Sequence, residues 1–178
     1  MTRMADAKKI LVLGLGNDCL GDDAVGLKVV QELRRQRTIV QGGDVDVLET
    51  SAAGMVLLDL MAGYRVLILI DAIQTGNGEP GRIYRLTEDA LAAASGSPEA
   101  MTWSAHHMGL RGILENGRRA GCDLPDTVIV YAVETEISRE WRRGCGREVE
   151  RAIPEVVRRV TGELQSMAFS DSGERGSR

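Results

Sequence analysis

Apolar residues along the chain form short continuous runs that alternate with segments of helical spacing. The runs predict buried strands, because a strand covered on both faces of a parallel sheet carries consecutive apolar residues. The other segments place an apolar residue every three or four positions, which predicts amphipathic helices. The predicted strands lie at residues 10–13, 45–48, 66–70 and 127–133, and the predicted helices at 24–33, 55–61, 106–116 and 149–164.

This alternation predicts an α/β fold, a three-layer αβα sandwich with a mostly parallel central sheet. Crossovers between parallel strands are right-handed, so helices are expected on both faces of the sheet. Alternating polar and apolar residues at 81–86 predict a further strand at an edge. A single domain is expected over residues 1–168, followed by a small, polar and therefore disordered tail at 169–178. Pro154 predicts a kink or a break in the last helix.

Composition and charge narrow the classes of function. The chain has 178 residues, of which 43% are hydrophobic, enough for the core of one ordinary domain. A net charge of −4, with one Phe, three Tyr and two Trp, argues against a nucleic-acid binder. No apolar run approaches the roughly 18–20 residues of a membrane span, and the first residues lack a signal-peptide pattern. The three cysteines include no CxxC pair, which argues against a zinc ribbon or a disulfide framework. We therefore expect a soluble, cytoplasmic protein.

Acidic residues and both histidines of the chain follow the ends of the predicted strands. In open α/β sheets, ligands bind at the carboxyl ends of the strands, where the strand order reverses. Because these ends lie at one edge of the sheet, the polar residues predict a ligand site there. They are Asn17, Asp18, Asp22, Asp23, Glu49, Thr50, Ser51, Asp71, Ser104, His106, His107, Glu134 and Glu136.

The glycines after the first strand resemble the start of a dinucleotide-binding loop, but the pattern is incomplete. Cys19 stands where the third glycine would be. Asp22 and Asp23 lie at the start of the following helix, where their charge would repel a pyrophosphate. We therefore expect no nucleotide site, and we interpret Cys19 as a loop or buried thiol.

Each of these acids and histidines can either stabilise the fold or bind a ligand. Asp22 is expected to cap the following helix, since aspartate is a favoured N-cap and complements the helix dipole. That leaves Asp23 to serve a ligand. Asp71 either bonds to loop amides or faces a ligand, and His106 and His107 either lie merely near a helix start or contribute a ligand. If Asp23, Asp71 and one histidine converge, they form an open carboxylate–imidazole site that suits nickel, zinc, manganese or iron(II).

Two blocks of the sequence resemble the hydrogenase maturation proteases, the endopeptidases that finish the large subunit of nickel–iron hydrogenases. The first block carries Gly-Leu-Gly-Asn and then Gly-Asp-Asp within residues 14–26, and the second is Ser-Ala-His-His-Met-Gly-Leu at 104–110. The resemblance covers about residues 9–164. The remaining matches follow in the family's order at 51–55, 71–72 and 80–81.

The resemblance implies an endopeptidase that acts in the cytoplasm, as an expected monomer, on the precursor of a nickel–iron hydrogenase large subunit. It removes the C-terminal extension of the precursor once nickel has been inserted. The family's metal-contacting positions correspond to Asp23, Asp71 and His106, which are therefore the expected catalytic and metal-contacting residues. His107 falls at a position that is often not histidine. The nickel is expected to arrive with the precursor, and other divalent metals are expected to substitute for it.

The resemblance leaves the mechanism and the partner open. The metal can polarise the scissile carbonyl and activate a water, with a carboxylate as general base. It can instead serve as a recognition tag that positions the peptide. Residues 133–138 match the family only loosely, so the cognate hydrogenase is open too. Two further hypotheses are a metal- or partner-binding module of the same fold that does not cleave, and a hydrolase of the same fold with an unrelated substrate.

Overall fold

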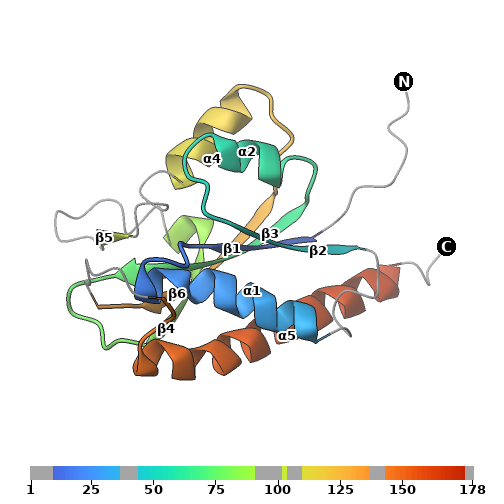
Figure 1. The fold of residues 1–178 in the computed structure, drawn as a ribbon. Helices are drawn as coiled ribbons and strands as arrows, with labels where there is room; N and C mark the ends of the chain where they lie inside the picture. The colour runs from blue at the N-terminus through green and yellow to red at the C-terminus, as the bar shows by residue number, and fades with distance from the viewer. Residues whose placement is uncertain (1–9, 37–43, 91–101, 104–109, 137–142, 175–178) are drawn as a thin grey trace.

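A computed structural model of the chain describes residues 10–36, 44–90, 102–103, 110–136 and 143–174. The strands are β1 (Ile10–Leu15), β2 (Val45–Thr50), β3 (Val66–Gln74), β4 (Ile83–Thr87), β5 (Thr102–Trp103) and β6 (Thr127–Glu134). The helices are the 3-10 helix η1 (Gly21–Ala24) and the α-helices α1 (Val25–Arg35), α2 (Val56–Met61), α4 (Leu110–Arg119) and α5 (Arg147–Glu174). The sheet lies between two layers of helices, with α1 and α5 on one face and α2 and α4 on the other (Figure 1).

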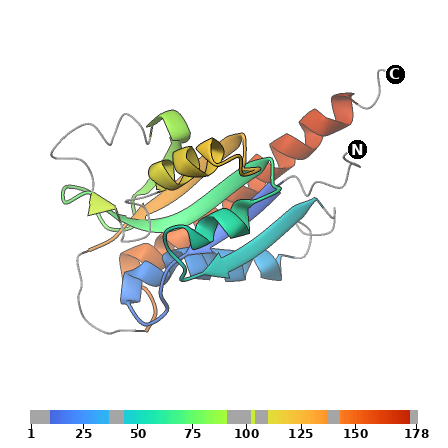
Figure 2. The same cartoon turned by 90° about the horizontal axis from the view of Figure 1, so that it is seen from above.

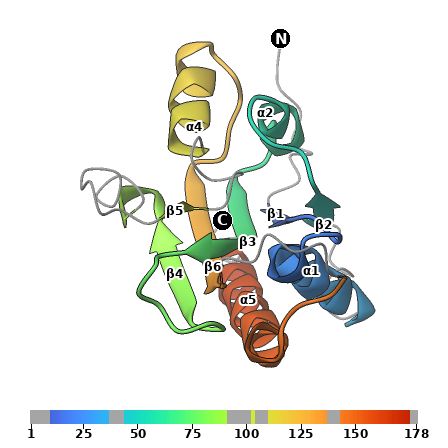
Figure 3. The same cartoon turned by 60° about the vertical axis from the view of Figure 1, so that its left-hand side comes forward.

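The sheet is mostly parallel because helices connect its central strands. The strand order is β2-β1-β3-β6-β4. β1 pairs in parallel with β2 and β3, and β3 pairs in parallel with β6. β4 runs antiparallel to β6 at the edge, and β5 pairs antiparallel with the end of β3. The predicted αβα sandwich and its edge strand are therefore confirmed, and Figure 3 shows the three layers from the side of β4.

Two apolar cores hold the helical layers on the sheet, because successive side chains of a strand point to opposite faces. On β3, Ile68 and Ile70 pack into the core with α1 and α5, whereas Leu67 and Leu69 pack into the core with α2 and α4. All four are at most 1% exposed. Figure 2 shows α2 and α4 lying over the second of these faces. A strand buried on both sides needs apolar residues at every position, which explains the continuous run in the sequence.

β3 is longer than the strand predicted at 66–70. It continues through Asp71 to Gln74, because its last residues keep β6 as a neighbour as far as the pair of Ile73 and Glu134. Asp71 therefore lies inside a strand and not in a loop after it, which corrects its predicted position.

The last helix is also longer than predicted. α5 runs without a break from Arg147 to Glu174 with Pro154 inside it, so the predicted break does not occur. Pro154 removes one backbone hydrogen bond, but the buried Ile153 and Val157 hold the helix on the core on both sides of it. Because a formed helix extends at one hydrogen bond per residue, α5 also continues into the segment predicted as a disordered tail. Within the described residues, no helix has both the length and the apolar character that crossing a membrane requires.

The strand order reverses between β1 and β3. The connection after β1 passes through α1 on one face to β2, whereas the connection after β2 passes through α2 on the other face to β3. The connections after β1 and before β3 therefore lie on opposite faces of the sheet, and the two strands are neighbours. The carboxyl ends of β1 and β3 flank the crevice in which open α/β sheets bind their ligands.

Candidate active site

Asp23 lies in η1, directly after the loop that follows β1. In this loop the Cys19 amide donates to Asn17 Oδ1 (3.0 Å), and the Leu20 amide donates to the Asn17 carbonyl (3.0 Å). The Asp23 amide then donates to the Leu20 carbonyl over 3.3 Å. The Oδ2 atom of Asp23 is buried from solvent. Asp23 is thus held at the carboxyl end of β1 with part of its carboxylate inside the protein.

Two glycines let this turn lie directly against the sheet. A Cβ atom at Gly16 would lie 2.0 Å from the Asp23 carbonyl oxygen. A Cβ atom at Gly26 would lie 2.2 Å from the Leu15 oxygen and 2.4 Å from the Ile70 oxygen. Atoms do not approach so closely, so neither position accepts a side chain. The backbone around Asp23 therefore packs on β1 and β3 with no side chain between them.

Asp71 is a fully buried acid on β3, with 0% of its surface exposed. The Ala72 amide donates to its Oδ1 atom over 2.7 Å. Leu69 and Ile73, two positions away on either side, belong to the core with α2 and α4, so Asp71 faces that layer. Burying a carboxylate is unfavourable unless it is hydrogen-bonded, paired or bound to a metal. The hydrogen bond from Ala72 meets part of this requirement, and Asp71 remains a candidate site residue.

The structure brings together the elements that carry the two predicted acids. η1 contacts β3. Gly26, three residues after Asp23, lies against the carbonyl of Ile70, which directly precedes Asp71. Asp23 and Asp71 therefore share the edge of the sheet at which the strand order reverses, as the sequence predicts.

The third predicted ligand, His106, lies outside the described residues, as does His107. In the sequence, the described elements on either side of the two histidines are β5, whose Trp103 pairs with Ile73 of β3, and α4, which begins at Leu110. The assignment of His106 therefore stays a prediction. Among the residues that the structure describes, no three His, Cys, Asp or Glu side chains form a group that could hold a metal ion.

Glu134 is a buried acid at the same edge whose role the sequence analysis missed. It is the last residue of β6, not a residue after it, and only 2% of it is exposed. Its carboxylate accepts hydrogen bonds from the Thr75 amide (2.7 Å), the Thr75 hydroxyl (2.9 Å) and the Tyr84 hydroxyl (3.0 Å). Burial raises the pKa of Tyr84, and the hydrogen bond to Glu134 raises it further. Glu134 fixes the connection between β3 and β4, and its only signal in the sequence is an acid that closes an apolar run.

Asp22 does not cap the helix that follows it, which corrects the prediction. Neither η1 nor α1 has a side-chain cap, because α1 continues directly from η1 and the Val25 amide already donates to the Asp22 carbonyl. The Asp22 carboxylate instead accepts a hydrogen bond from the amide of Gly146, just before α5. This contact joins the turn that carries Asp23 to the last helix of the chain.

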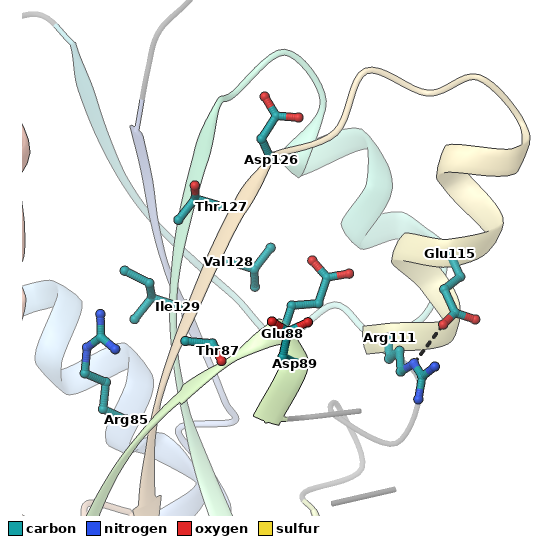
Figure 4. A pocket seen from close by; sticks show the side chains of 10 residues that line it. All are labelled: Arg85, Thr87, Glu88, Asp89, Arg111, Glu115, Asp126, Thr127, Val128 and Ile129. Atoms are coloured by element: carbon teal, nitrogen blue, oxygen red, sulfur yellow. Dashed lines mark hydrogen bonds and ion pairs between the residues drawn. The ribbon is translucent and has the colours of Figure 1, made fainter. Parts of the chain in front are cut away.

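A pocket of about 500 Å³ lies at the opposite end of the sheet, where β6 begins (Figure 4). Two of the four acids that line it are paired with arginines: Arg118 bonds to Glu88 (2.9 Å) and Arg111 to Glu115 (2.7 Å), and the other two acids are Asp89 and Asp126. The hydrogen bond to Glu88 raises the pKa of Arg118. Neither Asp23 nor Asp71 lines this pocket, so the carboxyl edge remains the candidate site.

Comparisons of sequence with known proteins agree with one another. A family described as hydrogenase maturation protease matches residues 27–163. The Hydrogenase 2 maturation protease of Escherichia coli (strain K12) is 33% identical over 157 residues, which are 88% of this chain and 91% of that protein. A putative hydrogenase maturation protease of Methanocaldococcus jannaschii is 26% identical over 163 residues, which are 89% of this chain and 97% of that protein.

Solved structures share the fold. The hydrogenase maturating endopeptidase HybD from E. coli superposes with a TM-score of 0.72 at 31% sequence identity, covering 89% of this chain and 93% of that one. The NiFe hydrogenase maturation protease HybD from Thermococcus kodakarensis superposes with a TM-score of 0.65 at 20% identity, covering 88% of this chain and 99% of that one. The second match shows the fold alone, whereas the first joins fold and sequence over nearly the whole chain.

Proposed function

Because the chain belongs to the hydrogenase maturation protease family, we propose that it removes the C-terminal extension of a nickel-loaded nickel–iron hydrogenase large-subunit precursor. The observation that carries this proposal is the fully buried Asp71 beside the η1 turn with Asp23, where the strand order reverses. The proposal includes action in the cytoplasm and as a monomer.

Asp23, Asp71 and His106 are the residues proposed to hold the nickel of the precursor. Carboxylate oxygens and an imidazole nitrogen are suitable donors for this ion. The hydrogen bond described for the Asp71 side chain comes from a neutral amide, which stabilises the carboxylate without cancelling its charge. The metal is part of the substrate in this proposal, so the site recognises a precursor only after nickel has been inserted.

Hydrolysis adds the oxygen of a water to the scissile carbonyl carbon and a proton to the leaving nitrogen. In one form of the proposal, nickel polarises the carbonyl while a carboxylate of the site accepts the proton of the water and returns it to the leaving amine. In the other form, nickel only positions the peptide and the carboxylates assist the water. Both forms require Asp23 and Asp71, and both give the same two products.

The test is intact mass spectrometry of a precursor large subunit after incubation with this protein. We expect loss of one defined C-terminal peptide from the nickel-loaded precursor and no loss from the nickel-free precursor, which is the matched control. Binding of the loaded precursor without any loss of mass would contradict cleavage and favour a non-cleaving module of the same fold. Equal cleavage of the loaded and nickel-free precursors would contradict the role of nickel in recognition.

A further inference from the structure

The turn that carries Asp23 is attached to the far end of the chain by its neighbour. The Asp22 carboxylate accepts a hydrogen bond from the Gly146 amide, although the two residues are 124 positions apart. The Cys145 thiol lies 3.8 Å from the Gly21 carbonyl oxygen and donates to it. Both contacts join η1 to the segment that leads into α5.

The segment on the other side of these contacts is well anchored. The Glu150 amide donates to the Gly146 carbonyl over 2.8 Å, so Gly146 accepts the first hydrogen bond of α5. Val149, Ile153 and Val156 then bury the first turns of this helix in the core that includes α1. The Gly146 amide therefore belongs to a rigid element, and the Asp22 charge lies where the helix dipole favours an anion.

The hydrogen bonds within η1 hold this turn only weakly. η1 has only four residues and no side-chain cap. The hydrogen bond from the Asp23 amide to the Leu20 carbonyl is long, at 3.3 Å. Short 3-10 turns have poor hydrogen-bond geometry, so their shape depends on outside contacts. On the sheet side those contacts are the close approaches at Gly16 and Gly26.

We propose that Asp22 is a positioning residue, whose hydrogen bond to Gly146 fixes the η1 turn and so the direction of the Asp23 carboxylate. The proposal rests on the proposed function for the role of Asp23 in the reaction. The sheet holds the turn from one side, and the Asp22–Gly146 bond holds it from the other. Small displacements of a reacting group reduce rates strongly, because catalysis depends on alignment.

Three variants test this inference: Asp22→Ala removes the acceptor, Asp22→Asn keeps an oxygen that accepts from Gly146, and Asp59→Ala removes an exposed acid of α2 outside the candidate site. Amide hydrogen exchange reports the order of the turn without any substrate. In Asp22→Ala, we expect exchange at the Asp23 and Gly146 amides to rise about tenfold. Asp22→Asn and Asp59→Ala should exchange like the wild type.

Cleavage of the nickel-loaded precursor is measured in the same variants. We expect kcat of Asp22→Ala to fall about tenfold or more with KM within about threefold, because alignment and not binding is lost. Asp22→Asn should retain kcat within about threefold, and Asp59→Ala should match the wild type.

Two results would overturn the inference. One is an Asp22→Ala variant that is less stable but keeps wild-type kcat and wild-type exchange at Asp23, since Asp22 would then only anchor α5. The other is an Asp22→Asn variant that is as impaired as Asp22→Ala, since the hydrogen bond would then not be responsible. If the wild type does not cleave the precursor, the proposed function fails, and the exchange rates alone still decide whether Asp22 orders the turn.

Discussion

Acidic side chains gather at both ends of the central sheet, but they are bonded in different ways. At the end where β6 begins, Glu88 bonds to Arg118 and Glu115 bonds to Arg111. These ion pairs are partly exposed, and each cancels the charge of its acid. Such pairs contribute little to stability, about 0–1 kcal/mol each.

At the carboxyl end, the hydrogen bonds described for Asp71, Asp22 and Glu134 come from neutral groups, whereas Glu49 of β2 pairs with Arg34. The Ala72 amide donates to Asp71, and the Gly146 amide donates to Asp22. Glu134 accepts from an amide and two hydroxyl groups. Neutral donors stabilise a carboxylate and leave its charge in place.

The two ends of the sheet differ in burial: the ion pairs at the amino end are partly exposed, whereas Asp71 and Glu134 at the carboxyl end are buried. Buried charges act over longer distances than charges in water, because the local dielectric constant is lower. The pocket of about 500 Å³ lies at the amino end, whereas the buried acids Asp71 and Glu134 lie at the carboxyl end. Burial of its acids distinguishes the candidate site.

The largest expected effect is on stability, from a substitution that disturbs the packing of Gly26 on β1 and β3. Gly26→Ala places a Cβ atom against the backbone oxygens of Leu15 and Ile70, neither of which can move freely. We expect the free energy of unfolding to fall by about 3 kcal/mol or more, measured by urea denaturation. Gly162→Ala is the control, since a Cβ there meets nothing within 4 Å in α5, and it should raise stability by about 0.5–1 kcal/mol. A Gly26→Ala variant as stable as the wild type would contradict the close contact between the turn and the sheet.

A second change compares one acid from each end of the sheet. Asp71→Asn keeps an oxygen that accepts from Ala72 but removes the charge, so precursor cleavage should fall about 100-fold or more while the fold is kept. Glu115→Gln removes the charge of an acid that is paired with Arg111, so cleavage should stay at the wild-type rate. Mass spectrometry measures cleavage, and circular dichroism checks the fold. If Asp71→Asn still cleaves, Asp71 is not part of the site.

The smallest effect concerns hydrogen bonds from neutral donors, which also occur away from the site. Each tyrosine of the chain donates to a carboxylate: Tyr64 to Asp46, Tyr84 to Glu134 and Tyr131 to Glu163. Burial, followed by the hydrogen bond to Asp46, raises the pKa of Tyr64 to about 12. Burial is also the first cause of the raised pKa values of Tyr84 and Tyr131.

A raised pKa in the folded state means that folding favours the protonated hydroxyl. The stability that Tyr64 contributes is therefore complete below pH 10 and is lost as the pH rises through about 12. An alkaline titration followed by phenolate absorbance should show the last step near pH 12, and Tyr64→Phe should remove that step. Ionisation of all three tyrosines near pH 10 in the folded chain would contradict these bonds.

The sequence was sufficient to predict the layers of the fold, since a strand buried on both faces must be apolar throughout. It could not predict that β3 continues beyond residue 70. An acid usually ends a buried run, and the extension depends on pairing with β6, which is distant in the sequence. Asp71 was therefore identified as a site residue for a reason that was partly wrong, because it lies within the strand and not after it.

At the candidate site, Asp23 and Asp71 could be predicted because both follow apolar runs whose ends share one edge of a parallel sheet. The partner of Asp22 could not be predicted in the same way. It is a backbone amide, which every residue except proline provides, so Gly146 leaves no mark in the sequence. Glu134 was noted as an acid near a strand end, but its partners become clear only when β3, β4 and β6 lie together.

The hydrogen bond between Asp22 and Gly146 also bears on when the site becomes competent during synthesis. A chain grows from its amino end, so Asp22 and Asp23 leave the ribosome long before Gly146 does. Contacts between residues far apart in the sequence form late, because closing the long loop between them costs conformational entropy before the contact stabilises the fold. Before Gly146 has been synthesised, the chain thus carries Asp22 and Asp23 without the hydrogen bond that fixes the η1 turn. In our proposal, the site becomes aligned only when α5 docks, which delays proteolytic activity until α5 has been synthesised.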